Sequence, residues 1–246
     1  STKVLDATIA LAEECKVAGG ARGRLIPALR RQMQQIIGPE EMERLQNRSG
    51  PVGIAYQELF PLRRSVVQTE FTSLEDLMDA VSFSSTFPFF SDRWPVAVDA
   101  RQSFPKLVVD GFFSVPRERF GCPDLCQIVA TTTTTTTDEP ERQQKEVDEV
   151  LVACFPQEQM GLTAVTSDRC ISPAENAFDD VALIPNSEKK VEKSTFGIAS
   201  FIQIAMETCP AKTYFDVYER GLADGEAWSL KESEAGLSSS EYTPLN

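Results

Sequence analysis

Segments rich in β-branched residues alternate with segments of helical periodicity along this chain, and this alternation limits the folds that are open to it. The strand-like segments are 52–56, 65–71, 106–110 and 150–155, and the helix-like segments are 4–16, 26–37, 74–82, 196–206 and 213–230. Ser73 precedes the third helix-like segment and is followed three residues later by Asp76, a pattern typical of a capped helix start. The alternation favours an α/β fold.

The domain boundaries follow from length and from local composition. A chain of 246 residues, with 41% apolar and 25% charged residues, can build one sizeable globular core. Thr131 to Thr137 is an uninterrupted threonine tract, and with the mixed, net acidic run to Glu149 it is typical of a low-complexity insertion. We therefore expect one α/β domain over 1–230, an insertion at about 130–149 outside the sheet, and an acidic, Ser-rich tail at 231–246.

The charge and hydropathy of the chain exclude some partners. A net charge of -13 argues against a nucleic-acid partner, because affinity for phosphate backbones comes from clustered lysine and arginine. No apolar run reaches the length of a membrane-spanning helix, and residues 1–10 lack the basic and apolar regions of a signal peptide. We expect an intracellular chain whose contact with a membrane, where it has one, is peripheral.

The chain contains no histidine, which restricts its chemistry. It cannot by itself supply a Ser-His-Asp triad, a Cys-His pair or an H-E-x-x-H zinc site. The six cysteines include one C-x3-C pair, Cys122 and Cys126, and no second pair at metal-ligand spacing. We therefore expect no metal and no cofactor. Chemistry based on carboxylates, hydroxyls, thiols or backbone dipoles remains, as does a role without chemistry.

Asp110 is the candidate catalytic residue. It ends the strand-like segment 106–110 and precedes Gly111, so its carboxylate would be fixed at a sheet edge with room for close approach. The alternative is an ordinary Asp-Gly turn without catalytic function. No serine of the chain stands in a G-x-S-x-G nucleophile elbow.

Two further segments are candidates for contact with lipid. Five basic residues and no acidic residue lie between positions 16 and 39, and four of the five, Arg22, Arg24, Arg30 and Arg31, could face anionic lipid or an acidic partner. The alternative is an ordinary solvated helix face. The aromatic segment that follows contributes Phe87, Phe89, Phe90 and Trp94, which fit either a lipid-sized pocket or a corner of the core.

Several segments in the same order resemble the patatin-like phospholipases, in the branch that includes adipose triglyceride lipase and adiponutrin. The segments that carry the resemblance are Ser49 to Tyr56, Phe71 to Ala80, Phe83 to Phe90, Val108 to Gly111, Val150 to Phe155, Ser167 to Cys170 and Tyr218 to Leu230. The resemblance implies a three-layer fold with a mostly parallel central sheet flanked by helices. Its first strands and nucleophile elbow are absent from the matched region.

The resemblance also implies a function. It predicts a lipid acyl hydrolase that acts on acylglycerol or phospholipid esters through a Ser-Asp dyad, with Asp110 as the base and the serine outside this chain. The second glycine of the family's D-G-G segment is Phe112 here. The alternative is a non-catalytic structural or lipid-binding subunit, in which a protein partner covers the exposed edges of the truncated sheet.

Overall fold

The structure is a computed structural model of the chain, and it describes residues 2–119, 121–123, 149–153, 157, 166, 169–173 and 211–239. The expected insertion at 130–149 lies outside the described residues except at Glu149, as does the whole helix-like segment 196–206. None of the helices in the described ranges is long and apolar enough to cross a membrane.

The helices of the described residues confirm four expected helical segments, 4–16, 26–37, 74–82 and 213–230. They are α1 (Thr2–Val17), α2 (Leu25–Ile36), α3 (Pro39–Gln46), α4 (Leu74–Ser84) and α8 (Ala211–Ser239). The Ser73 side chain caps α4 by accepting a hydrogen bond from the Asp76 backbone N–H at 3.1 Å, as the sequence pattern predicts. The helix α3 was not among the expected segments, because Gly38-Pro39 is also typical of the end of a helix such as α2. Proline is equally suited to a first helical turn.

The expected α/β fold with a mostly parallel central sheet is wrong. The described residues form a four-stranded antiparallel sheet in the order β2-β1-β4-β3, and the parallel pairing there is confined to two short strands, β5 and β6. The strands are β1 (Ile54–Phe60), β2 (Arg64–Gln68), β3 (Ala97–Asp99), β4 (Lys106–Asp110), β5 (Leu151–Val152) and β6 (Cys170–Ile171). The links 61–63 and 100–105 are too short for the crossover that parallel neighbours require, so each forms a hairpin.

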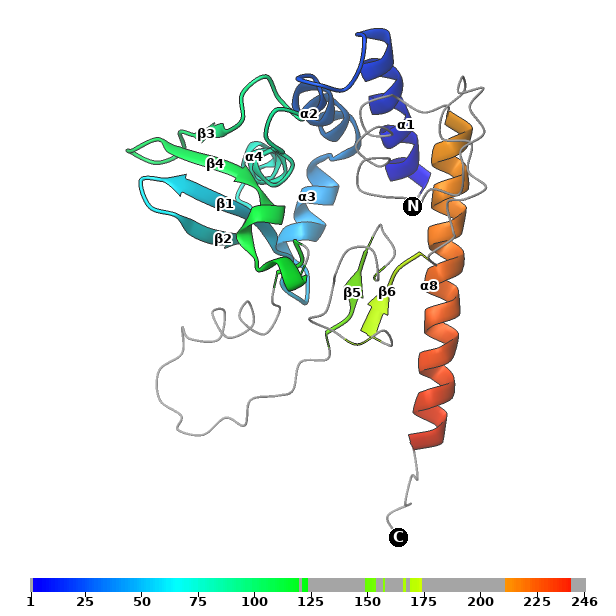
Figure 1. Cartoon of the computed structure of the whole chain (residues 1–246). Coiled ribbons are helices and arrows are strands. Elements are labelled where there is room, and N and C mark those ends of the chain that lie inside the picture. Colours follow the sequence, from blue (N-terminus) through cyan, green and yellow to red (C-terminus); the bar gives the residue numbers. More distant parts are fainter. Residues whose placement is uncertain are drawn as a thin grey trace, which may run out of the picture.

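Helices and sheet pack in succession rather than as a sandwich with helices on both faces. Tyr56 of β1 and Val108 of β4 contact Phe83 of α4, and the helix lies across this face of the sheet. Beyond α4 lie α2 and then α1, with the long helix α8 beside α1 (Figure 1). A second core cluster forms around Met78 and Phe71, where α2, α3 and α4 meet. This packing places the end of β4 beside the end of α4.

Candidate functional site

Asp110 lies where β4 leaves the sheet. Its backbone N–H donates to the carbonyl oxygen of Thr86, just beyond the end of α4, at 3.0 Å. Its register opposite Tyr56 puts the carboxylate on the face of the sheet that α4 covers, because directly paired residues of antiparallel strands share a face. A short 3-10 turn, Gly111–Ser114, follows directly and begins with the Phe112 N–H donating to Asp110 Oδ1 at 2.8 Å. The expected position at a strand end is confirmed.

The surroundings of Asp110 disfavour its charged form. Burial raises the pKa of this carboxyl from 3.8 to about 6, and the hydrogen bond from the Phe112 N–H opposes that rise only in part. Among the described residues, no lysine or arginine forms a salt bridge with it. A carboxylate whose pKa lies near 6 accepts a proton more readily than an ordinary aspartate at neutral pH, and this suits a general base.

Gly111 lets the end of β4 lie directly against β1. A Cβ atom at this position would lie 2.3 Å from the Ala55 carbonyl oxygen, far inside contact distance. The glycine is therefore required for close backbone approach rather than for an unusual backbone angle.

We expect Gly111→Ala to lower the free energy of unfolding by about 2 to 3 kcal/mol, because the clash is with backbone and β4 must shift to relieve it. The matched control is Gly221→Ala in α8, where an added Cβ meets nothing within 4 Å. That change is expected to stabilise the chain by up to about 1 kcal/mol, since alanine has the higher helix propensity. Urea denaturation measures both, and equal effects would contradict the role given to Gly111.

An aromatic cluster stands next to Asp110. Phe87 lies with its ring centroid 6.3 Å from Phe112 and 5.5 Å from Phe113, and the last two are 5.3 Å apart. Phe87 and Phe112 are both partly open to solvent. Of these three, only Phe87 was a candidate from the sequence. The adjacent Phe112-Phe113 pair directly after a strand end was the available signal for the other two.

The four aromatic candidates from the sequence do not share one environment. Phe89 and Trp94 are 63% and 72% exposed, and Phe87 is 40% exposed. Phe90 instead packs against a buried cluster between α1 and α2 that includes Cys15 and Ala28. The lipid-contact interpretation therefore remains open for three of them, and Phe90 belongs to the core.

The four arginine candidates also divide. Arg30 of α2 forms ion pairs with Glu75 and, at 2.7 Å, with Asp79, both on α4. Arg31 pairs with Glu14 of α1. These two arginines therefore hold helices together rather than facing a partner.

Arg22 and Arg24 lie before α2 and are exposed. Arg22 Nε donates to the Phe89 carbonyl oxygen at 3.1 Å, and Arg24 Nη1 donates to the Gly20 carbonyl oxygen at 3.3 Å. Neither forms a salt bridge with a carboxylate in the described part of the chain. They remain available for an anionic partner.

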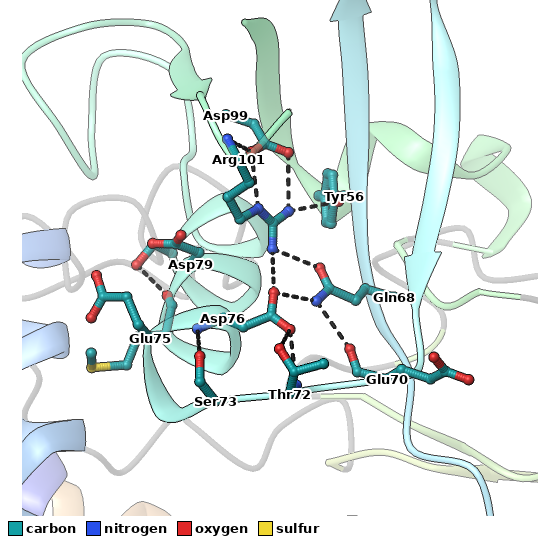
Figure 2. Close-up of polar contacts among 12 residues, drawn as sticks. Tyr56, Gln68, Glu70, Thr72, Ser73, Glu75, Asp76, Asp79, Asp99 and Arg101 are labelled. Atoms are coloured by element: carbon teal, nitrogen blue, oxygen red, sulfur yellow. Dashed lines mark hydrogen bonds and ion pairs between the residues drawn. The ribbon is translucent and has the colours of Figure 1, made fainter. Parts of the chain in front are cut away.

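An arginine-centred polar network lies beside the sheet, and Figure 2 shows its contacts. Arg101 forms two side-chain bonds to Asp99, at 2.9 and 3.0 Å, and one to Asp76 at 2.7 Å. It also donates to Gln68 at 3.1 Å and to the Tyr56 hydroxyl at 3.2 Å. Sequence reasoning missed this network, because its members come from four separate elements and its arginine lies in a loop.

This network has a structural role. All three guanidinium nitrogens of Arg101 are engaged, and the group lies 5.0 Å from the centroid of the Phe83 ring. Burial raises the pKa of Asp99, but hydrogen bonds from Arg101 outweigh this and hold that pKa below its ordinary value. No donor is left over for a substrate, and the cluster ties β3 to β1, β2 and α4.

An open hollow of about 380 Å³ lies on the other face of the sheet. Its lining includes Gln57, Arg63, Ser65 and residues 113–116. It offers a cation and hydroxyl groups but no carboxylate, so it does not suit acid-base chemistry. Asp110 and its aromatic neighbours therefore form the candidate site.

Comparison of the chain with protein-family models, with curated proteins and with solved structures found no match. The candidate site consequently rests on its own geometry and on the segmental resemblance in the sequence.

Proposed function

We propose that Asp110 is the general base of an acyl hydrolase site that acts on lipid esters. The observation that carries the proposal is a half-buried carboxylate, with its pKa raised to about 6, beside an aromatic cluster that is partly open to solvent. The carboxylate supports proton transfer, and the aromatic rings support binding of an acyl chain. The resemblance of segment 108–111 to the patatin-like D-G-G region supports the same assignment.

The reaction needs a nucleophile from another segment. Asp110 would take the proton of a serine hydroxyl as the serine oxygen attacks the ester carbonyl and forms a tetrahedral intermediate. The same proton then goes to the departing alcohol oxygen as the ester bond breaks. Water repeats the cycle on the acyl-serine and releases the fatty acid. Since no serine here stands in G-x-S-x-G, the proposal places the nucleophile on sequence beyond these 246 residues.

A non-catalytic lipid-binding module is the second candidate, and Phe112 favours it. This residue occupies the position where the patatin-like segment has a second glycine, and its backbone lies against Gly121, whose added Cβ would meet Phe112 Cα at 3.3 Å. The hydrogen bond from its N–H also gives the Asp110 carboxylate an ordinary turn-forming role. Under this alternative the site binds acyl chains without turnover.

The test is the pH dependence of ester hydrolysis by the protein purified intact from its natural source. We expect kcat/KM for a medium-chain ester to rise tenfold per pH unit below about pH 6 and to level off above it, because Asp110 must be deprotonated to act. A fluorophosphonate probe should label one serine, which peptide mass spectrometry would locate.

Two results would count against the proposal. An absence of both hydrolysis and labelling, while a control lipase is active in the same assay, would leave the lipid-binding module. Hydrolysis that does not change between about pH 5 and about pH 8 would exclude Asp110 as the base.

A further inference from the structure

Two loops that are distant in sequence lie against each other beside α2. The Gly23 N–H donates to the Phe90 carbonyl oxygen at 2.9 Å, and the Ile26 N–H donates to the Ser91 carbonyl oxygen at 3.3 Å. An added Cβ on Gly23 would lie 3.5 Å from the Arg93 backbone nitrogen, so the two loops approach each other closely here. The loop at 20–24 and the loop at 87–94 therefore form one continuous surface.

The loop at 87–94 presents aromatic side chains to solvent. Phe87, Phe89 and Trp94 are the exposed ones, whereas Phe90 is partly buried and packs against the cluster of Cys15 and Ala28. Phe89 has a φ of 63°, a left-handed conformation that is costly for a bulky residue. The Arg22 side chain bonds to its carbonyl oxygen, and the two neighbouring backbone bonds fix the loop around it. The surrounding contacts thus hold Phe89 in a strained conformation that exposes its ring.

Three basic side chains lie on the same two loops as these aromatic residues. Arg22, Arg24 and Arg93 are exposed, and none of them forms a salt bridge in the described ranges. The acidic groups nearby are few: Asp92 accepts a hydrogen bond from the Arg93 N–H, and Glu14 is paired with Arg31. A local excess of positive charge in a chain of net charge -13 is unusual.

We propose that this aromatic-basic face, made of Arg22, Arg24, Phe87, Phe89, Arg93 and Trp94, docks on an anionic lipid surface. Tryptophan and phenylalanine bury their rings favourably at the boundary between head groups and acyl chains, and arginines nearby are attracted to anionic head groups. The net acidic remainder of the chain is repelled by the same surface, so charge complementarity favours docking through this face. Anionic lipid accounts for both the charge and the exposed rings, whereas an acidic peptide would account for the charge only.

The docking face is continuous with the candidate site through one residue. Phe87 belongs to the face and also contacts Phe112 and Phe113 beside Asp110. Docking would therefore bring the aromatic cluster against the lipid. The docking proposal does not depend on hydrolysis, and it holds equally for a lipid-binding module without turnover.

The test uses the full chain and vesicles of two compositions. One set is phosphatidylcholine alone, and the other contains about 30% phosphatidylserine. The chain has two tryptophans, Trp94 and Trp228, so Trp228→Phe leaves Trp94 as the single reporter. We expect cosedimentation with the anionic vesicles, a blue shift of Trp94 emission on binding, and loss of binding as salt is raised.

Charge-matched variants locate the docking surface. Replacing Arg22, Arg24 and Arg93 with glutamine is expected to weaken binding about fivefold for each arginine, and on the order of a hundredfold together. The control replaces three other exposed cations with glutamine, Arg44, Lys212 and Lys231, and is expected to leave binding unchanged. Both triple variants change net charge equally, so a difference reports position.

A second pair of variants tests the aromatic residues against another exposed apolar surface. Leu62 and Phe104 are exposed at the turns of the two hairpins, and Phe104 contacts Phe60 there. We expect Phe89→Ser with Trp94→Ser to weaken vesicle binding about tenfold or more, and Leu62→Ser with Phe104→Ser to have little effect. Circular dichroism confirms that each variant folds.

Three outcomes would overturn the docking proposal. They are an absence of binding to either kind of vesicle, equal weakening by the two charge-matched triple variants, and weakening by the Leu62 and Phe104 pair in place of the Phe89 and Trp94 pair. Because binding is measured without ester turnover, a chain that binds vesicles but hydrolyses nothing would contradict the proposed function and support docking.

Discussion

Replacing Arg101 with glutamine is expected to lower the free energy of unfolding by about 3 to 5 kcal/mol. Asp99 is only 3% exposed, and Arg101 is the cation that pairs with it. Without the guanidinium, a buried carboxylate is left without its counter-charge, which is more costly than the loss of the attraction alone. Asp76 loses an ion pair at 2.7 Å at the same time.

The shape of the guanidinium explains why glutamine cannot substitute. Its two-pronged contact with Asp99 uses Nε and Nη2, and the remaining nitrogen reaches Asp76 and Gln68. A glutamine amide has two donor hydrogens on a single nitrogen and no charge. It can therefore not bond to both carboxylates at once. Still less can it bond to both carboxylates and to the Tyr56 hydroxyl.

Urea denaturation at neutral pH measures the effect, with Arg44→Gln as the matched control. Arg44 pairs with Glu40 on the exposed face of α3, at 74% and 71% side-chain exposure, and such pairs contribute about 0.5 kcal/mol or less. A loss of under about 1 kcal/mol for Arg101→Gln would contradict the structural role assigned to the network.

The helices near the N-terminus could be predicted because their signals are local. Apolar residues at helical spacing predict α2, and Ser73 with Asp76 marks the start of α4. Helix α3 was not predicted because Gly38-Pro39 fits both the end of one helix and the beginning of the next. In the structure the Gly38 N–H donates to the Glu41 carboxylate at 2.9 Å, a contact typical of the beginning of a helix.

The direction of the strands could not be predicted from the same kind of signal. Residues 61–63 between β1 and β2 contain no Asn-Gly or Asp-Gly pair, and β3 is a three-residue strand that lies outside all of the segments expected to be strands. The parallel sheet was expected from a family resemblance rather than from the strands themselves. Short links between strands were the physical evidence against it.

The position of Asp110 in the candidate site could be predicted from the sequence, but the contacts around it could not. The position of Asp110 follows from a strand that ends in Asp-Gly, whereas its bond to Thr86 and the ring contact between Phe87 and Phe113 depend on tertiary packing. The sequence shows that Arg30 and Arg31 are charged residues of a helix. It does not show whether their side chains face solvent or pair with a neighbouring helix. Here neighbouring helices provide carboxylates for both.

Asp110→Asn is expected to slow ester hydrolysis strongly and to stabilise the fold. Removal of a general base costs about a hundredfold to ten-thousandfold in rate. The asparagine amide oxygen can still accept from the Phe112 N–H, so the turn at 111–114 is preserved. The substitution removes the free-energy cost of holding a charged carboxylate in a half-buried position. In the wild type this cost lowers the free energy of unfolding.

The pH dependence gives that stabilisation a definite sign. Because the pKa of Asp110 rises from 3.8 to about 6 on folding, the folded chain binds this proton more tightly than the unfolded chain. The wild type therefore loses stability as the pH rises from about 4 to about 6, and the loss persists at higher pH. Asparagine does not titrate, so the variant should gain roughly 1 to 3 kcal/mol above pH 7 and nothing below about pH 4.

Urea denaturation at several pH values measures the gain, with Asp6→Asn as the control at an exposed position of α1. The control is expected to change stability by less than about 0.5 kcal/mol at any pH. A destabilised Asp110→Asn variant at pH 7 would mean that the carboxylate is favourably paired in the folded chain. A carboxylate stabilised in that way would have a lowered pKa and would be a poor base, so one stability measurement bears on the electrostatics that the catalytic proposal requires.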